Sequence, residues 1–258
     1  MQIDNQNIIL TGAASGIGLA LLKRLAAYDC RIIAVDRDSF DVPQAGRARI
    51  LPYQADLSQP ETVDEIIAYA TEQIGGVDIF IANAGFAYYG DFHATSWEQI
   101  EAIHRVNVFS PLYTITRMRA LNPGREHMVV ITASAIAQLP IPGYALYGAT
   151  KAALNHFTWG YRFEAPPEAR LMLVYPIATR TGFFQAANPT TPQLRPSQTA
   201  DFVAGRIVNG IRHNRKHVRP SSPYQIFYMV GRVFPFIHWI YQFYGLWLLK
   251  RWRRRQQA

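Results

Sequence analysis

The chain has 258 residues, of which 49% are hydrophobic and 17% are charged. This length suits one large α/β domain or two small ones and is enough to bury a full core. The composition excludes collagen-like, low-complexity and wholly disordered chains. A single cysteine, Cys30, excludes a disulfide framework and a Cys-rich zinc site and fits a reducing compartment. Because the N-terminus lacks the basic and apolar regions of a secretory signal, we expect a cytoplasmic protein.

The formal net charge of +8 is concentrated near the C-terminus. Residues 195–258 contain 12 Lys and Arg against one acid, Asp201, out of 26 basic and 18 acidic residues in the chain. Nucleic-acid-binding domains usually spread positive charge along a reading face, so we expect no nucleic-acid partner. The uneven charge indicates instead that the C-terminal end meets something anionic.

Strand-like and helical runs alternate along the first 220 residues. The expected strands are 8–10, 31–35, 49–53, 78–83, 128–133, 170–175 and a short one at 216–219. The expected helices are 17–28, 60–74 with Ser58 as N-cap, 97–121 (one helix, or two broken near Pro111), 144–163 and 199–213. Apolar strands separated by helices indicate a parallel sheet covered on both faces, hence a Rossmann-type doubly wound fold. We expect a single domain over residues 1–222 and an extra segment over 223–258.

A glycine-rich turn follows the first expected strand, between Thr11 and Gly18. Glycines let the backbone turn tightly and approach a pyrophosphate, and the N-terminus of the next helix supplies free N–H groups. Three residues separate the first two glycines, whereas the usual dinucleotide-binding turn has one. We interpret the turn as a cofactor site formed by Gly12, Ser15, Gly16, Ile17 and Gly18.

Asp36 ends the second expected strand. A carboxylate at this position accepts hydrogen bonds from the adenosine ribose hydroxyls and repels a 2′-phosphate. We therefore predict NAD as the cofactor. NADP is left open, because the neighbouring Arg37 is able to pair with a 2′-phosphate.

Tyr147 and Lys151 are four residues apart on an expected helix, so their side chains project from the same face. A nearby ammonium favours the phenolate and lowers the pKa of a tyrosine from about 10. Tyr147 would then donate or accept a proton near neutral pH. A Tyr-x-x-x-Lys pair alone is common, and its meaning depends on the residues around it.

Together these residues resemble the classical short-chain dehydrogenases/reductases. The resemblance covers residues 7–220 and rests on the order and spacing of Thr11-Gly12-x-x-x-Gly16-Ile17-Gly18, Asn83-Ala84-Gly85, Asn107, Ser134 and Tyr147-x-x-x-Lys151. Two positions depart from the family's usual motifs: Ala82 replaces the first Asn of Asn-Asn-Ala-Gly, and Ile177 replaces the Gly of a Pro-Gly pair. Ile177 would remove some of the backbone freedom that glycine gives near the nicotinamide.

The resemblance implies roles for individual residues. Tyr147 would be the general acid/base, Lys151 would hold the nicotinamide ribose and lower the tyrosine pKa, and Ser134 would hydrogen-bond the substrate oxygen. Asn107 would hold a water in a proton relay to Lys151. Further cofactor contacts would come from Asp56, Leu57, Asn83, Ala84, Gly85 and Thr181. The hydride itself would belong to the cofactor.

The expected substrate side is apolar. Residues 183–196 match the position of the family's mobile substrate loop, and the expected substrate contacts are Ser134, Tyr144, Tyr147, Phe183 and Phe184. Phe86, Tyr88 and Tyr89 add further aromatic side chains. We therefore expect a small lipophilic alcohol or ketone as substrate. The seven histidines show no ligand spacing with carboxylates or Cys30, so we expect no metal site.

The chain continues beyond the family's usual length with an aromatic and then basic segment. Residues 233–249 carry no formal charge, are interrupted by His238 and Gln242, and also contain Pro235 and Gly245. Lys-Arg-Trp-Arg-Arg-Arg follows at 250–255. The stretch is short for a spanning helix, and its Trp, Tyr and Arg side chains favour a membrane interface. We hypothesise that residues 233–255 bind an anionic membrane surface peripherally. An oligomer contact or a cap on the substrate pocket is the alternative.

Three functions follow in order of preference. The first is an NAD(P)-dependent oxidoreductase acting on a lipophilic alcohol/ketone pair. The second is an NADP-dependent reductase of 3-ketoacyl groups linked to CoA or a carrier protein, and the third is a non-catalytic dinucleotide-sensing membrane scaffold. The resemblance also implies a homodimer or homotetramer formed by helix pairing.

Overall fold

The computed structural model describes residues 1–43 and 45–257, without the side chain of residue 257. Its core is a seven-stranded sheet in the order β3-β2-β1-β4-β5-β6-β9, in which every neighbouring pair is parallel. The strands are β1 (Asn7–Thr11), β2 (Arg31–Asp36), β3 (Arg49–Gln54), β4 (Ile79–Ala82), β5 (His127–Thr132), β6 (Ala169–Val174) and β9 (His217–Val218). The predicted Rossmann-type fold class is confirmed.

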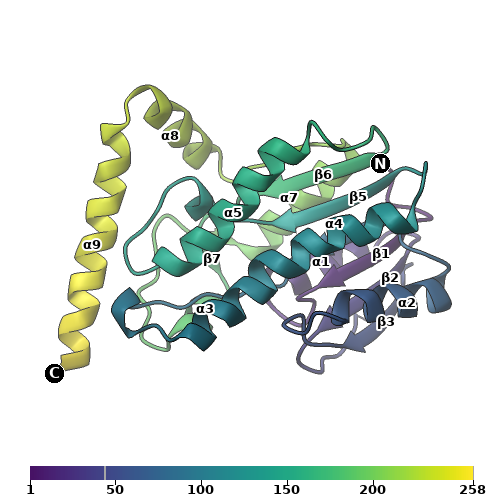
Figure 1. The fold of residues 1–258 in the computed structure, drawn as a ribbon, viewed down its shortest axis with the longest axis horizontal. Coiled ribbons are helices and arrows are strands. Elements are labelled where there is room, and N and C mark those ends of the chain that lie inside the picture. Colours follow the sequence, from purple (N-terminus) through teal and green to yellow (C-terminus); the bar gives the residue numbers. More distant parts are fainter. Residues whose placement is uncertain (44, 258) are drawn as a thin grey trace.

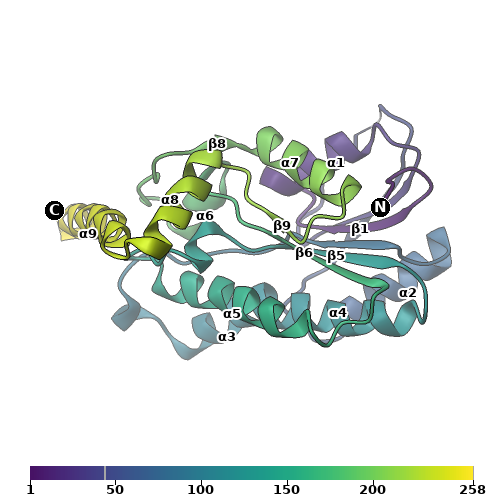
Figure 2. The ribbon, with the colours of Figure 1, turned by 90° about the horizontal axis from the view of Figure 1, so that it is seen from above.

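Helices cover both faces of the sheet, which is why β1, β4 and β5 are buried along their whole length. On one face lie α1 (Gly16–Leu25) and α7 (Ala200–Arg212). On the other lie α2 (Thr62–Ile74), α4 (Ser110–Leu121) and α5 (Ala145–Tyr161) (Figure 2). In the sheet, β1 has β2 on one side and β4 on the other, so the direction in which the strands are added reverses at β1. A crevice forms at the carboxyl ends of the strands at such a reversal.

The first turn of α2 differs from the prediction. Its N-cap is Glu61, not Ser58. Asp56 holds a turn before the helix: its carboxylate accepts from the Ser58 N–H at 2.9 Å, and its carbonyl accepts from the Thr62 hydroxyl at 2.8 Å. The helix therefore starts later than an N-cap at Ser58 requires.

The long helical run after residue 97 breaks earlier than Pro111. It consists of α3 (Trp97–His104), a π-helical turn η2 (Arg105–Phe109) and α4. Pro111 lies in the first turn of α4, where its missing N–H removes no intrahelical bond. The interruption surrounds Asn107, whose side chain is fully buried and bonds to other elements. π-helical turns of this kind are frequent at functional sites.

Residues 179–199 contain short regular elements that the sequence does not predict. They are β7 (Thr179–Arg180), α6 (Phe183–Ala187) and β8 (Gln198–Thr199), and β7 and β8 form a parallel two-stranded sheet. This pairing joins the two ends of the expected substrate loop. The remaining short turns are η1 (Phe92–Ala94) and η3 (Ala135–Ala137).

The C-terminal segment forms two helices, α8 (Ser222–Val233) and α9 (Phe236–Gln257), separated at Pro235. Gly245 does not interrupt α9. It lies against Pro142 and Ile141, whose atoms would be 2.9 and 2.8 Å from an added Cβ. In Figure 1, α8 leads away from the sheet and α9 runs along one end of the molecule. Among the described helices, none is both long and apolar enough to cross a membrane.

Candidate active site

A cavity of about 1000 Å³ opens at the carboxyl ends of the strands. It is lined by the turn after β1, by the ends of β2 to β6, by α5 and by the C-terminal helices. This volume lies at the upper end of the range for ligand pockets, so the cavity has room for a dinucleotide beside a second molecule.

The glycine-rich turn forms one end of the cavity, and its shape requires glycine. Gly12 and Gly16 have positive φ angles of 70° and 54°, which disfavour other residues. A Cβ on Gly18 would lie 1.7 Å from the Gly12 carbonyl oxygen. Asp36 braces the turn by accepting from the Ala14 N–H at 2.8 Å. The turn thus presents backbone at the N-terminus of α1, as an anion site requires.

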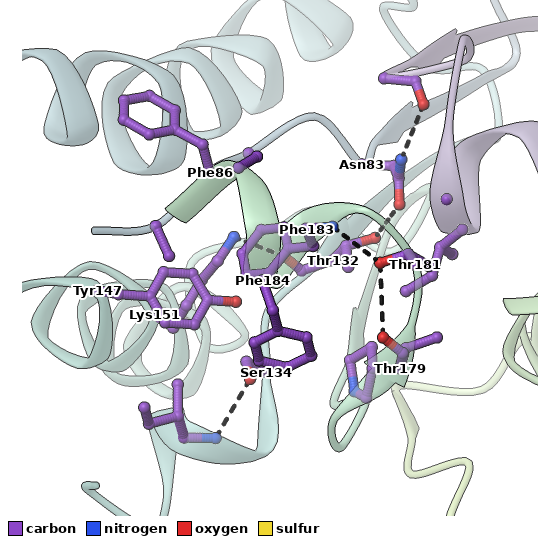
Figure 3. A pocket seen from close by; sticks show the side chains of 18 of the residues that line it. Asn83, Phe86, Thr132, Ser134, Tyr147, Lys151, Thr179, Thr181, Phe183 and Phe184 are labelled. Atoms are coloured by element: carbon purple, nitrogen blue, oxygen red, sulfur yellow. Dashed lines mark hydrogen bonds between the residues drawn. The ribbon is translucent and has the colours of Figure 1, made fainter. Parts of the chain in front are cut away.

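Hydrogen bonds connect this turn to Lys151 through the ends of three strands (Figure 3). The Asn83 amide donates to the Thr11 carbonyl at 3.1 Å and accepts from the Thr132 hydroxyl at 3.1 Å. The Thr132 carbonyl accepts from the Lys151 ammonium at 2.9 Å. The lysine is therefore held in register with the turn. Thr132 is a site residue that the sequence analysis missed, although its place two residues before Ser134 at a strand end was a usable signal.

Tyr147 and Lys151 project from α5 into the cavity, and Lys151 Nζ lies 5.8 Å from the tyrosine ring centroid. Burial raises the pKa of Tyr147 to about 12, and the Ser134 hydroxyl opposes this rise. Burial also lowers the pKa of Lys151 to about 8. The residue spacing predicted the opposite direction, a lowered tyrosine pKa, because it did not include the loss of hydration, which is the largest influence on the buried phenol.

Asn107 does not line the cavity but lies behind it. Its amide nitrogen donates to the Phe86 carbonyl at 2.9 Å and to the Thr150 hydroxyl at 3.2 Å, and its amide oxygen accepts from the Phe86 N–H at 3.1 Å. These bonds tie the segment after β4 to α5. Asn107 therefore positions the wall beside Lys151.

The structure brings nearly all predicted cofactor residues to the cavity wall. Gly18 is the exception, since it packs behind the turn. Arg37 is exposed, and its Nε lies 3.6 Å from Asp38 Oδ1. Thr181 faces Gly16, with its methyl carbon 3.3 Å from the position of an added Cβ. The wall residues among the predicted set are Gly12, Ser15, Gly16, Ile17, Asp36, Arg37, Asp56, Leu57, Asn83, Ala84, Gly85, Tyr147, Lys151 and Thr181.

The residues present fit a dinucleotide. The turn has room only for glycine next to its backbone, Asp36 keeps acceptor capacity beyond its bond to Ala14, and the Lys151 ammonium has three donors, one of which bonds Thr132. These groups lie along one continuous cavity that also reaches Tyr147.

The other end of the cavity is apolar. Ser134 and Tyr144 line it together with Phe183 and Phe184, as predicted. The centroids of the Phe183 and Tyr147 rings are 5.6 Å apart (Figure 3). The wall also includes Ile141, which the sequence analysis missed, Leu194 from the expected substrate loop, and Pro223, Tyr224, Phe227 and Tyr241 from α8 and α9. The alternative of a cap on the pocket referred to the C-terminal segment but named no residues, because these helices lie beyond the family pattern.

The described histidine, cysteine and acidic residues form no group of three or more that could hold a metal ion. Burial raises the pKa of the Cys30 thiol to about 12, so this cysteine is an unreactive packed residue.

Fold and cavity together define a dinucleotide-binding α/β enzyme, and comparison with known proteins agrees. The short chain dehydrogenase family model matches residues 6–192. The uncharacterized oxidoreductase YbbO of Escherichia coli K12 is 28% identical over 236 residues, which cover 87% of each chain. Estradiol 17-beta-dehydrogenase 11 of Rattus norvegicus is 26% identical over 244 residues, which cover 90% of this chain and 81% of that one.

Solved structures share the fold. A short-chain dehydrogenase/reductase from Burkholderia phymatum in complex with NAD has a TM-score of 0.77 at 19% identity, covering 90% of this chain and 94% of its own. A short-chain dehydrogenase from Sphingobium yanoikuyae in complex with NADPH has a TM-score of 0.72 at 23% identity, covering 83% and 87%.

The chain belongs to the short-chain dehydrogenase family. The predicted family and the predicted enzyme class, an oxidoreductase, are confirmed. The predicted nicotinamide dinucleotide is in line with the ligands of the matching structures.

Proposed function

We propose that this short-chain dehydrogenase interconverts a lipophilic alcohol and its ketone or aldehyde with NAD as the preferred cofactor. One observation carries the proposal: the buried Tyr147–Lys151 pair lies where the glycine-lined end of the cavity meets its apolar end. A substrate oxygen near the tyrosine would then be next to the cofactor, while the rest of the substrate contacts aromatic side chains.

The residues have distinct roles in this proposal. The bound nicotinamide supplies or accepts the hydride. Tyr147, whose pKa is about 12, carries its proton at neutral pH and gives it to the carbonyl oxygen during reduction, or receives it from the alcohol during oxidation. Ser134 hydrogen-bonds the same oxygen. Lys151 uses its remaining donors to hold the nicotinamide ribose, and Asn107 positions the wall beside it.

The preference for NAD rests on Asp36. Its carboxylate lines the cavity at the end of β2, where it accepts hydrogen bonds from ribose hydroxyls and repels a 2′-phosphate. Arg37 is close to Asp38, so its charge is partly compensated. Titration of the protein with NADH and NADPH, followed by nicotinamide fluorescence, tests this; tighter binding of NADPH would contradict it.

The lipophilic substrate class rests on the aromatic and aliphatic wall around Tyr147. Estradiol 17-beta-dehydrogenase 11 is a relative whose name gives a lipophilic substrate. A panel of hydrophobic alcohols, polyols and sugars, each assayed by NADH formation with detergent present, tests the class. Acetoacetyl-CoA tests the alternative of a 3-ketoacyl reductase. Turnover of sugars in preference to all hydrophobic alcohols would contradict the proposal.

Two partners belong to the same proposal. A homodimer or homotetramer would bury exposed aromatic residues of α3, η2, α4 and α5, namely Trp97, Phe109, Tyr113 and Trp159. Sedimentation velocity tests this assembly. An anionic membrane surface, bound peripherally through residues 233–255, is the second proposed partner.

A further inference from the structure

The α9 helix has one side that packs on the pocket. Leu248 and Leu249 are buried against the cluster that contains Tyr144 and Tyr147. Nearer the start of the helix, the Tyr241 hydroxyl donates to the Arg195 carbonyl at 3.2 Å. The side that faces the molecule is therefore fixed in place by contacts along the helix.

Near its end, α9 is joined to two different loops beside the pocket. The Trp252 indole N–H donates to the Thr190 hydroxyl at 2.8 Å, and Arg253 forms an ion pair with Asp91. Thr190 belongs to the substrate loop, whereas Asp91 follows β4. These contacts hold α9 against the body while its other side remains free.

The opposite side of α9 is apolar and exposed. Phe236, Trp239, Ile240, Phe243 and Trp247 recur at helical spacing and are each 54–66% exposed. The neighbouring α8 and the link to α9 add Ile226, Met229, Val230, Val233 and Phe234, which are 39–70% exposed. We call these ten residues the outer face. The exposed fractions show that no described element covers these side chains. Figures 1 and 2 show α9 at the outer end of the molecule.

The charge beside the outer face favours an anionic lipid surface over a second copy of the chain. Residues 202–258 contain no Asp or Glu. The exposed basic residues there include Arg232, Lys250, Arg251, Arg254 and Arg255. Two copies paired in parallel through α9 would bring these clusters together, and antiparallel pairing would set each cluster against the partner's apolar half. Exposed Trp and Phe followed by Arg and Lys is the composition of helices that lie in a membrane interface.

The outer face is separated from the pocket by a single layer of helix. Pro223, Tyr224 and Phe227 of α8 and Tyr241 of α9 line the cavity. On the same two helices, Ile226 and Ile240 belong to the outer face. A protein lying on lipid through this face would thus place the apolar end of its pocket one helix away from the acyl chains.

We infer that α8 and α9 lay the apolar end of the pocket on an anionic lipid surface and that the substrate is taken from that lipid phase. The inference has two halves. The docking half, binding to lipid, rests on the outer face and its charge, and the substrate half, uptake of substrate from that lipid, rests on the proposed oxidoreductase function. The substrate would be an alcohol or ketone that partitions into a bilayer.

Vesicle flotation of the full chain tests the docking. We expect the protein to float with phosphatidylcholine–phosphatidylserine vesicles at 3:1 and at least tenfold less with phosphatidylcholine alone, and to be released by high salt. The double variant Trp239→Gln/Phe243→Gln should lose at least tenfold in flotation, and Arg254→Gln/Arg255→Gln should lose severalfold. Phe202→Gln, which changes an exposed apolar residue of α7, should float like the unchanged protein.

Quenching by brominated phospholipid identifies the face that inserts. The fluorescence of Trp239 and Trp247 should be quenched, so Trp239→Phe/Trp247→Phe should lose most of the quenching while Trp159→Phe keeps it. Trp159 is equally exposed but lies on α5. Equal quenching in both variants would overturn the inference.

Initial rates test the supply of substrate. When 2-undecanone is supplied in anionic vesicles, the initial rate of the unchanged protein should follow the mole fraction of the ketone in the bilayer. The initial rate of Trp239→Gln/Phe243→Gln should follow the concentration of the ketone in water. The double variant should reduce the water-soluble ketone 4-methyl-2-pentanone at the unchanged rate, because the altered residues do not line the pocket.

The outcomes separate the two proposals. Failure of the protein to float would overturn the inference and leave the oxidoreductase proposal intact. If Trp239→Gln/Phe243→Gln also turned a dimer into a monomer in sedimentation, the outer face would be the contact with a second copy of the chain. Rates that follow the aqueous concentration in the unchanged protein would also overturn it. Flotation without turnover of any alcohol or ketone would support the docking half, and it would contradict the proposed function and with it the substrate half.

Discussion

The two ends of the pocket are built in different ways. The proposed cofactor end uses the glycine turn and strand ends from the first 85 residues together with Tyr147, Lys151 and Thr181, and backbone geometry and hydrogen bonds fix the turn. The proposed substrate end gathers side chains from four separate parts of the chain and is closed by α8 and α9. A local motif thus shapes most of the first end, whereas the second depends on how distant helices pack. The cofactor end should therefore tolerate substitution less than the substrate end does.

The largest expected effect is at Gly18. Gly18→Ala would place a Cβ 1.7 Å from the Gly12 carbonyl oxygen, so the turn must move. We expect dinucleotide affinity to fall at least a hundredfold and the free energy of unfolding to fall by about 1–3 kcal/mol. Gly160→Ala is the control, because its added Cβ meets nothing within 4 Å. Fluorescence titration measures the dinucleotide affinity, and urea unfolding measures the free energy of unfolding. A normal affinity in Gly18→Ala would contradict the expectation that the cofactor end tolerates substitution less than the substrate end.

Lys151 should show a conflict between stability and function. Its pKa is about 8 in the folded protein and 10.5 ordinarily, so burial of the ammonium destabilises the fold below pH 8, and this cost fades as pH rises from 8 to 10.5. Lys151→Met should end turnover yet raise the free energy of unfolding at pH 7 by about 2 kcal/mol, after allowing for the lost bond to Thr132.

Urea unfolding across this range measures the difference between Lys151→Met and the unchanged protein. The difference should shrink toward pH 10.5. A variant that is less stable at pH 7 would show that the ammonium stabilises the free protein.

Asp36 should control cofactor choice with little effect on folding. Asp36→Asn keeps an acceptor for the Ala14 N–H, gives up the acceptor for the exposed Asp38 N–H, and removes the charge that repels a 2′-phosphate. We expect the ratio of NADPH to NADH affinity to rise about tenfold to a hundredfold, equivalent to about 1.4–3 kcal/mol. Asp38→Asn, two residues along, should change the ratio much less. Titrations of both variants with NADH and NADPH measure the ratio. An unchanged ratio in Asp36→Asn would show that Asp36 does not determine cofactor preference.

The smallest effect is expected at the contact between α9 and the loop after β4. Arg253 and Asp91 form an ion pair with side chains 44% and 36% exposed. A double-mutant cycle with Arg253→Ala and Asp91→Ala should give a coupling energy of about 0–1 kcal/mol. Dinucleotide affinity should not change. Coupling well above this range would mean that the substrate end is held as rigidly as the cofactor end.

The sequence predicted the fold, and the residues it proposes for the cofactor line the cavity, because the determining features are local. Alternating apolar runs predict the strands, and Asp36 and the Tyr147–Lys151 pair lie where strand-end and helical spacing place them. It failed at Ser58, which is not the N-cap because Asp56 holds a turn before the helix. It also did not predict that the helical run opens at Asn107 into a π turn, where the Asn107 amide bonds Phe86 and Thr150.

Burial also escaped the sequence analysis. Residue spacing gives the distance between a phenol and an ammonium but not the loss of hydration that raises the pKa of Tyr147. In the same way, two apolar faces on α9 read as one aromatic run in the sequence, and the fold is needed to show which face meets the pocket.

The central claim is that the Tyr147 hydroxyl exchanges the proton of the substrate oxygen. Its most direct test is Tyr147→Phe, assayed for turnover of a hydrophobic alcohol and, separately, for NADH affinity. We expect turnover to fall by about 10²–10⁴-fold, the usual contribution of a positioned acid/base group, while NADH affinity stays within about twofold. Near-normal turnover in Tyr147→Phe would contradict the account.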